Sequence, residues 1–559
     1  MCQPEKSALA DRQTPKTTTT SSPTILREGA GGQAVATPLV YPPFHNNNNK
    51  PPTTTTTTTT TRYFTRKDIA DKLAADPHAL WIILHRSVYE LTDYYASHPG
   101  GQLVLRHYNG RDATDAFENY HRAHVVKFLL PRYYRGELQG DNHVHNENHQ
   151  EEEDYNNPVI PTNDDTPPHV LAFRELKQEM LRRGMFTVPV GYYYRLYAWL
   201  AFLFFSAVTC TVYGQHCLPV QMLGAVLLGL FWQQYAGLGH DTGHTAVTKQ
   251  YATDHWMGSS LGAALTGLST AWWKHNHNTH HVVPNAIEHD PNIQHLPLMA
   301  ISQAVIEQPY RSTYHERDFW LSRVGTAVVS YQHYLFLPLM AVARFNLYAL
   351  GLKHLLHLVP TAPPTAFRST ELLAILGVFP LWYGALACRL PTRTTMLAWM
   401  VLSHAVTMLL HLQIVVSHWS MESYRAVEVE NDNNDKASLD KTKGTHNKQA
   451  NDNDDWYMLQ FRTTMDIACP PWMDWLHIGL QFQTAHHLYP TLPRPHLRTA
   501  TRMVKQVCAQ HGIVFSEMPF WAMVADSWRV LKETALLART GQYTHHHHRL
   551  LAQAWRAEG

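Results

Sequence analysis

Residues 196–244 have the sequence LYAWLAFLFFSAVTCTVYGQHCLPVQMLGAVLLGLFWQQYAGLGHDTGH. From Leu196 to Gly239 this stretch contains no Asp, Glu, Lys or Arg. At about 20 residues per membrane crossing, its length fits two helices, about 196–213 and 219–238, joined by a turn near Gly214–Pro219. Because helices buried in soluble proteins rarely continue this far without a charge, the stretch predicts a membrane domain.

A second apolar region predicts two further spans at about 372–388 and 395–415. Residues 324–343 form a weaker candidate, because they include Gln332, His333 and Pro338. We expect this segment to lie in the membrane interface or to re-enter rather than to cross. Basic residues are concentrated in cytoplasmic loops, so the side before the first span is predicted to be cytosolic. The basic residues there are Arg174, Lys177, Arg182, Arg183 and Arg195.

The bulk composition excludes several classes of protein. A chain of 559 residues can form two or three domains. Its net charge of +1 gives no indication that the protein binds nucleic acid. The six cysteines are scattered without a CxxC pair, which excludes a disulfide framework and a thiolate zinc site. Histidine is abundant, with 38 copies, and only its positions can decide whether it binds metal.

Low-complexity sequence separates the folded parts of the chain. Residues 1–62, which include the threonine run 53–61, have too little apolar surface to fold and are predicted to be disordered. They show no basic segment followed by an apolar one, so we expect no cleavable signal peptide and a cytosolic N-terminus. We also expect a solvated linker at 141–168, a disordered insertion at about 425–455 and a C-terminal tail at 536–559, whose His545–His548 run is assigned no function.

Residues 63–140 are expected to form a compact domain, with strands at 80–84 and 88–91 and a helix at 112–121. Within it, His98-Pro-Gly-Gly101 is followed by Gly110-Arg-Asp-Ala-Thr-Asp-Ala-Phe117 and by His121. The first motif alone fits a simple glycine turn equally well. A bis-histidine haem needs two imidazoles that face each other, and glycines beside them let the backbone approach the porphyrin.

Three histidine clusters lie outside this domain: His240-Asp-Thr-Gly-His244, His277-Asn-Thr-His280-His281 and Gln483-Thr-Ala-His486-His487. On a helix, positions i, i+3 and i+4 share a face, so each cluster can direct two or three imidazoles to one point. One such pair could arise by chance among 38 histidines. An even number of spans between the clusters would place all three on the cytosolic face. About eight imidazoles are more than one metal needs, which predicts two ions, and nitrogen ligands favour iron, copper or zinc.

Residues 63–140 resemble cytochrome b5, including the closing Arg135-Gly-Glu-Leu138. The resemblance implies an α+β domain that binds haem b with His98 and His121 as axial ligands. His107 and His124 are the alternatives to His121.

Residues 170–530 resemble membrane fatty-acyl desaturases and related hydroxylases. Glutamine at the start of the third cluster, together with an N-terminal cytochrome b5 domain, is typical of front-end desaturases. The segments 288–297, 462–466 and 479–494 are most similar to fungal and plant sphingolipid Δ8 desaturases. The resemblance implies an all-α, multi-span desaturase domain at 169–535 with a cytosolic histidine-box di-iron site.

By this resemblance the iron ligands are seven histidines of the clusters, and Gln483 is placed at or near the second iron. His418 is an expected further ligand, although a polar residue at a helix end would look the same, and His411 has the same ambiguity. Asp241 and Asp290 could orient ligating imidazoles. The seven are His240, His244, His277, His280, His281, His486 and His487.

The resemblance implies a Δ8 sphingolipid desaturase of the endoplasmic reticulum membrane, with its haem domain on the cytosolic side. It would use O₂ and electrons from NADH, delivered by a separate NADH-cytochrome b5 reductase. The alternatives are a Δ5 or Δ6 front-end fatty acyl desaturase, a lipid hydroxylase, and a non-catalytic membrane haem carrier.

Overall fold

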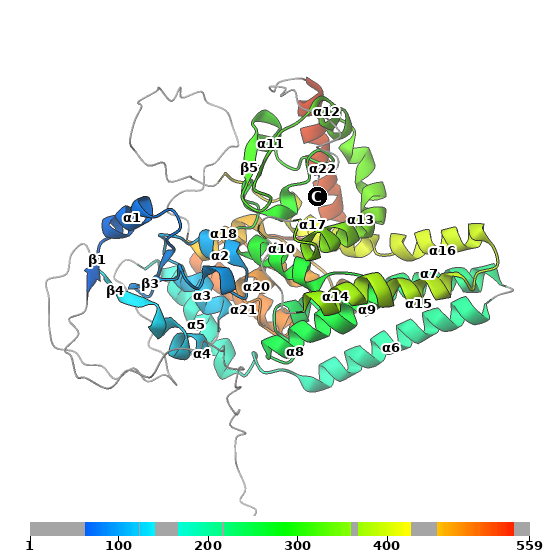
Figure 1. The fold of residues 1–559 in the computed structure, drawn as a ribbon, viewed down its shortest axis with the longest axis horizontal. Coiled ribbons are helices and arrows are strands. Elements are labelled where there is room, and N and C mark those ends of the chain that lie inside the picture. The colour runs from blue at the N-terminus through cyan, green and yellow to red at the C-terminus, as the bar shows by residue number, and fades with distance from the viewer. Residues whose placement is uncertain are drawn as a thin grey trace, which may run out of the picture. The chain divides into compact units, whose positions relative to one another are not determined.

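The computed structural model describes residues 62–121, 123–139, 166–214, 217–358, 361, 367–425 and 455–540 (Figure 1). These residues all lie within one compact unit, Thr57–Gly559. Residues 1–61 of the expected disordered tail, most of the expected linker and insertion, and the His545–His548 run lie outside the described residues. The last helix extends to Thr540, beyond the predicted domain end at 535.

The N-terminal domain is built on a four-stranded sheet in the order β1-β4-β3-β2. Strand β1 (Tyr63–Phe64) is parallel to β4 (Tyr134–Leu138), while β3 (Ser87–Glu90) is antiparallel to both β4 and β2 (Trp81–Leu84). Every residue of β2 is buried, because the sheet has a small apolar core on each face. The helices are α1 (Arg66–Ala75), α2 (Gln102–Arg106), α3 (Thr114–Tyr120) and α4 (Ala123–Phe128). This arrangement confirms the predicted α+β domain.

The second domain is mostly helical. After α5 (Pro168–Arg182), the apolar stretch forms α6 (Val190–Tyr213) and α7 (Leu218–Gly243), which pack along each other. Helices α15 (Phe379–Ala387) and α16 (Arg393–Ala405) extend beside them (Figure 1). The long apolar helices therefore form one bundle.

Further helices of the second domain lie outside this group of four. These helices are α8 (Tyr251–Trp256), α9 (Ala263–Thr266), α10 (Thr270–Val282), α11 (Ala304–Glu307), α12 (Arg323–Val329), α13 (Gln332–Leu355), α14 (Arg368–Leu373), α17 (Met408–Trp419), α18 (Trp456–Thr463), α19 (Asp474–His477), α20 (Gln483–Leu488), α21 (Leu497–His511) and α22 (Phe520–Thr540). Two small sheets pair β5 (Tyr310–Ser312) with β6 (Arg317–Phe319), and β7 (Asp466–Ile467) with β8 (Glu517–Met518).

Four helical segments among the described residues are long and apolar enough to cross a membrane: Val190–Tyr213, Gln332–Leu355, Arg368–Ala387 and Arg393–Trp419. Three of them correspond to predicted spans. The predicted span 219–238 forms α7, a helix of 26 residues that is not among the four and buries Gln221, Gln233 and Gln234.

The weaker candidate 324–343 is divided differently from the prediction. It breaks at Ser330–Tyr331 into α12 and α13, and α13 continues to Leu355. Three of the four apolar segments lie between the second and third histidine clusters. If those clusters meet on one face of a membrane, an even number of segments crosses completely, so the interfacial or re-entrant placement of α13 stays a prediction.

Candidate metal centre

The structure gathers eight histidines into two groups whose ligand atoms lie within 4.8 Å of one another. Both groups are built from helices that are distant in the sequence. Helices α10 and α20 each contribute to both groups, α7 contributes to the first, and α17 to the second. The first group contains His240, His244, His277, His281 and His486, and the second contains His280, His418 and His487. These are the eight histidines that the sequence predicts as metal ligands.

Helical spacing explains how one short segment serves two groups. On α10, His277 and His281 are four residues apart and share a face, whereas His280 is turned toward the second group. Gly243 lets the first cluster approach α10, because a Cβ there would lie 1.9 Å from the indole of Trp273. That indole packs against the rings of both His240 and His277.

The first group has its ring nitrogens directed toward one another. The Nε2 atom of His277 lies 3.2 Å from that of His240 and 2.9 Å from that of His281, which in turn lies 3.1 Å from Nε2 of His486. The Nε2 atom of His244 is buried without a hydrogen-bond partner among the described residues. Burial holds the pKa of His277, His281 and His486 well below the usual value, so these imidazoles are neutral and have lone pairs for a cation.

The second group is held from outside by hydrogen bonds. The Nδ1 atom of His280 donates to Asp290 Oδ2 at 2.8 Å, and that of His418 donates to the carbonyl of Thr463 at 3.0 Å. The Nδ1 atom of His487 donates to Gln460 Oε1 at 3.0 Å. Each bond leaves the Nε2 lone pair free and aimed inward, as ligating histidines require. This donor set fits a pair of transition-metal ions.

Gln483 lies beside the second group, as the sequence predicts. Its side-chain amide is 3.1 Å from His418 Nε2 and 3.4 Å from His487 Nε2. Rotation of the amide would place Oε1 at the same point, so the side chain offers either a donor or a ligand there. His411 belongs to neither group, and its Nδ1 donates to the carbonyl of Met340 at 2.8 Å.

The two aspartates differ in their partners. Asp290 contacts a histidine as expected, but Asp241 Oδ1 lies 4.0 Å from His240 Nδ1, which is longer than a hydrogen bond. Asp241 Oδ2 instead accepts a hydrogen bond of 2.7 Å from Arg494 Nη2 in a buried ion pair. Arg494 is the last residue of segment 479–494, and only the fold shows that its partner is Asp241.

Asp290→Asn is predicted to weaken the second group. Asp290 is fully buried and also accepts hydrogen bonds from the backbone N–H groups of Asn285 and Asn292. Loss of its charge removes the orienting partner of His280, so product formation should fall by about 10- to 100-fold with reduced bound iron. Metal analysis and product analysis check this, with exposed Asp318→Asn as the control. Full iron and full activity in Asp290→Asn would contradict the assignment.

The haem-domain histidines also face each other. The rings of His98 and His121 have centroids 6.0 Å apart, and each Nδ1 donates to a backbone carbonyl, of Gly101 at 3.0 Å and of Phe117 at 3.1 Å. Burial lowers the pKa of both to about 4, so both imidazoles are neutral and could donate a lone pair. This geometry fits two axial ligands of one haem.

Of the two alternatives to His121 as a haem ligand, the structure describes the side chain of His107 but not that of His124. His107 packs its ring against His289 of the second domain, with centroids 4.5 Å apart. The side chain of His124 lies outside the described residues.

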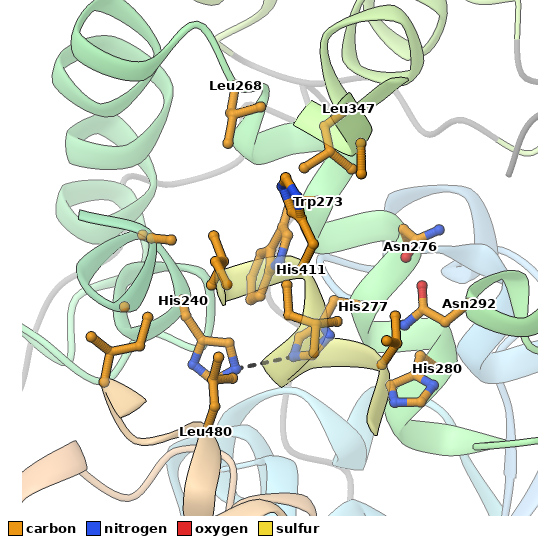
Figure 2. A pocket seen from close by; sticks show the side chains of 18 of the residues that line it. His240, Leu268, Trp273, Asn276, His277, His280, Asn292, Leu347, His411 and Leu480 are labelled. Atoms are coloured by element: carbon orange, nitrogen blue, oxygen red, sulfur yellow. Dashed lines mark hydrogen bonds between the residues drawn. The ribbon is translucent and has the colours of Figure 1, made fainter. Parts of the chain in front are cut away.

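A cavity of about 400 Å³ adjoins both histidine groups. Histidines of both groups line one part of it, and Figure 2 shows His240, His277 and His280 there. Much of the remaining lining is apolar, including Leu339, Met340, Leu347, Leu350, Leu410 and Ile414. A site of this kind suits an alkyl chain held against a metal centre.

Comparison with known proteins agrees with this geometry. The model of the family described as "Fatty acid desaturase" matches residues 217–519. The chain belongs to the fatty acid desaturase family. The model described as "Cytochrome b5-like Heme/Steroid binding domain" matches residues 65–139. This desaturase is therefore an oxidoreductase with a fused haem domain, and the family implies a di-iron centre at the histidine groups.

Three relatives cover most of this desaturase. A "Delta(8)-fatty-acid desaturase" of Helianthus annuus is 32% identical over 86% of this chain and 92% of the relative. An "Acyl-lipid (9-3)-desaturase" of Borago officinalis is 31% identical over 83% and 92%. A "Delta 8-(E)-sphingolipid desaturase" of Emericella nidulans is 29% identical over 86% and 98%.

Proposed function

We propose that the chain introduces a double bond at carbon 8 of the long-chain base of a membrane sphingolipid. The observation that carries this proposal is the apolar cavity that adjoins both histidine groups. Plant and fungal relatives named Δ8 desaturases support the position of the double bond, and the fungal relatives' names support the sphingolipid substrate.

The two histidine groups would hold two iron ions, with Gln483 beside the second. An iron centre of this kind supplies an oxidant made from O₂ for C–H bonds that no side chain can break. The protein would position the alkyl chain against the metal centre and exclude water from the cavity. Asp290 fixes His280, while Leu347 and Ile414 help to line the wall along which the chain would lie.

His98 and His121 would hold haem b, which receives electrons from NADH through a separate NADH-cytochrome b5 reductase. Fusion keeps this donor at high effective concentration beside the metal centre. We place the protein in the endoplasmic reticulum membrane. Both sites would lie on the cytosolic face, because the first apolar helix is preceded by basic residues.

A front-end fatty acyl desaturase is the second candidate. The Borago relative supports it, because its name specifies an acyl lipid at nearly the same identity as the Δ8 relatives. A hydroxylase would use the same metal centre and leave one more oxygen on the product.

Expression in a host that makes sphingolipids without Δ8 unsaturation tests the proposal. Mass spectrometry of long-chain bases and fatty acids should reveal a base two hydrogens lighter, with its new bond at carbon 8, which is absent in His280→Ala. Unchanged bases with a new bond near the carboxyl end of fatty acids would reject the substrate. A product heavier by one oxygen would reject desaturation.

A further inference from the structure

The haem domain contacts the metal-binding domain through the turn that carries His98. The side-chain amide of Asn278 donates to the carbonyl of Gly100 at 3.3 Å. Gly101, at a φ of 96°, lies so near the second domain that a Cβ would be 3.1 Å from Nδ1 of His275. Both Asn278 and His275 belong to α10, which carries three of the eight clustered histidines. The first haem ligand is thus fixed directly against the metal-binding helix.

The second haem-ligand segment is held by charged and polar contacts. Asp115 on α3 accepts hydrogen bonds of 2.7 Å and 3.1 Å from the guanidinium of Arg174. Lys177 donates to the backbone carbonyl of Glu118, and Asn119 Nδ2 donates to the hydroxyl of Tyr457 at 3.4 Å. These contacts hold residues 115–119, which come just before His121. Helix α3 therefore has a defined position on the second domain.

Tyr120 lies at the point where the two sites come together. It directly precedes His121, and its ring meets the ring of His281 edge to face, with centroids 6.2 Å apart and an interplanar angle of 90°. Its hydroxyl is buried and finds no hydrogen-bond partner among the described residues. A buried hydroxyl without a partner is costly, so hydrogen bonding does not explain a tyrosine here. What the residue supplies is an aromatic ring between a haem-ligand segment and a metal-site histidine.

We propose that the Tyr120 ring is the bridge through which electrons pass from the haem held by His98 and His121 to the metal centre at His281. This inference rests on the proposed function of both sites. Each passage moves one electron, so ferrous haem becomes ferric and the iron pair gains that electron. Two passages supply two electrons, and the two C–H bonds that break in the substrate release two electrons and two protons. Together with two protons from solution, these reduce O₂ to two water molecules. NADH, through the reductase, restores the haem after each passage.

The test compares the full-length holoprotein carrying Tyr120→Leu with Tyr120→Phe. The haem is reduced without oxygen and then mixed with O₂ and a ceramide, and its reoxidation is followed by stopped-flow absorbance. Leu, which lacks the ring, should slow reoxidation by about tenfold or more, while Phe should stay within about twofold of the wild type. Exposed Phe128→Leu on the same domain is the matched control.

Other readouts separate the bridge from a structural role. The haem spectrum, its midpoint potential and the rate of haem reduction by the reductase should be unchanged in all three variants. If Tyr120→Leu reoxidises at the wild-type rate, or if Tyr120→Phe is slowed as much as Tyr120→Leu, the proposal that electrons pass through the Tyr120 ring is wrong. If the wild-type protein reoxidises rapidly but makes no Δ8 product, the proposed substrate is wrong, while the proposed electron path through Tyr120 is retained.

Charge reversal at the docking contact gives an independent prediction. Asp115→Arg places a second guanidinium beside the largely buried one of Arg174 and should slow haem reoxidation by about tenfold or more. Adding Arg174→Asp restores an opposite pair and should recover the rate to within about threefold. Equal slowing in the single and double variants would show that the pair does not position α3 for electron transfer.

Discussion

His418→Ala is expected to abolish detectable desaturation and to remove about one of the two non-haem irons. His418 is the one member of the second group that lies outside the sequence clusters, and its Nε2 is 3.3 Å from that of His280. With it removed, His280 and His487 remain as the only histidines of that group. Loss of a direct ligand should exceed the effect of losing an orienting partner, so activity should fall by more than about 100-fold.

Iron and haem are measured in the same purified sample. The haem content of His418→Ala should equal that of the wild type, because His98 and His121 lie in the other domain. Exposed His511→Ala at the end of α21 is the control for histidine removal. If His418→Ala keeps all its iron and an activity within about twofold of wild type, then His418 is a polar residue at a helix end and no ligand.

His98→Ala is expected to eliminate haem and NADH-driven desaturation while the non-haem iron remains. The substitution removes one of the two facing imidazoles, so the domain can no longer hold the haem that donates electrons within the chain. A donor that must diffuse from solution works at far lower effective concentration, so the rate should fall by more than about 100-fold in a host without free cytochrome b5.

The absorption spectrum and the iron content check this prediction. Exposed His78→Ala in the same domain is the control. Added soluble cytochrome b5 should restore part of the activity of His98→Ala, since the metal centre is intact. A bis-histidine haem spectrum in His98→Ala would instead show that another residue supplies the axial ligand.

The sequence was most informative where short spacing determines geometry. His277, His280 and His281 lie on one helix, as the spacing predicts, but the spacing directs them to one point and only the structure shows that His280 belongs to the second group. His418 was predicted with an open alternative, because nothing near it in sequence repeats the cluster pattern. The structure resolves its position by bringing α17 to α10 and α20.

Partners from distant segments could not be predicted. Gln460 and Thr463 on α18 orient His487 and His418, and nothing in the local sequence assigns either of them to a histidine. The same limit applies to Asp241, whose partner Arg494 is more than two hundred residues away. Orientation of a metal ligand is a property of packing, and spacing along the chain does not contain it.

The extent of α13 was underestimated for a related reason. Arg344 lies within it, and a charge usually argues against an apolar helix. In the fold this guanidinium is fully buried, donates to the carbonyl of Thr266 and lies 4.4 Å from the ring centroid of Trp232. Hydropathy sums residues one by one and cannot register such compensation.

The most direct test of a haem-fed two-metal centre is the iron stoichiometry of the purified full-length protein. Elemental analysis combined with haem quantification should give about three irons per chain, one in haem and two outside it. His280→Ala should retain the haem and lose non-haem iron. One haem per chain without non-haem iron would contradict the metal centre and leave a membrane haem carrier.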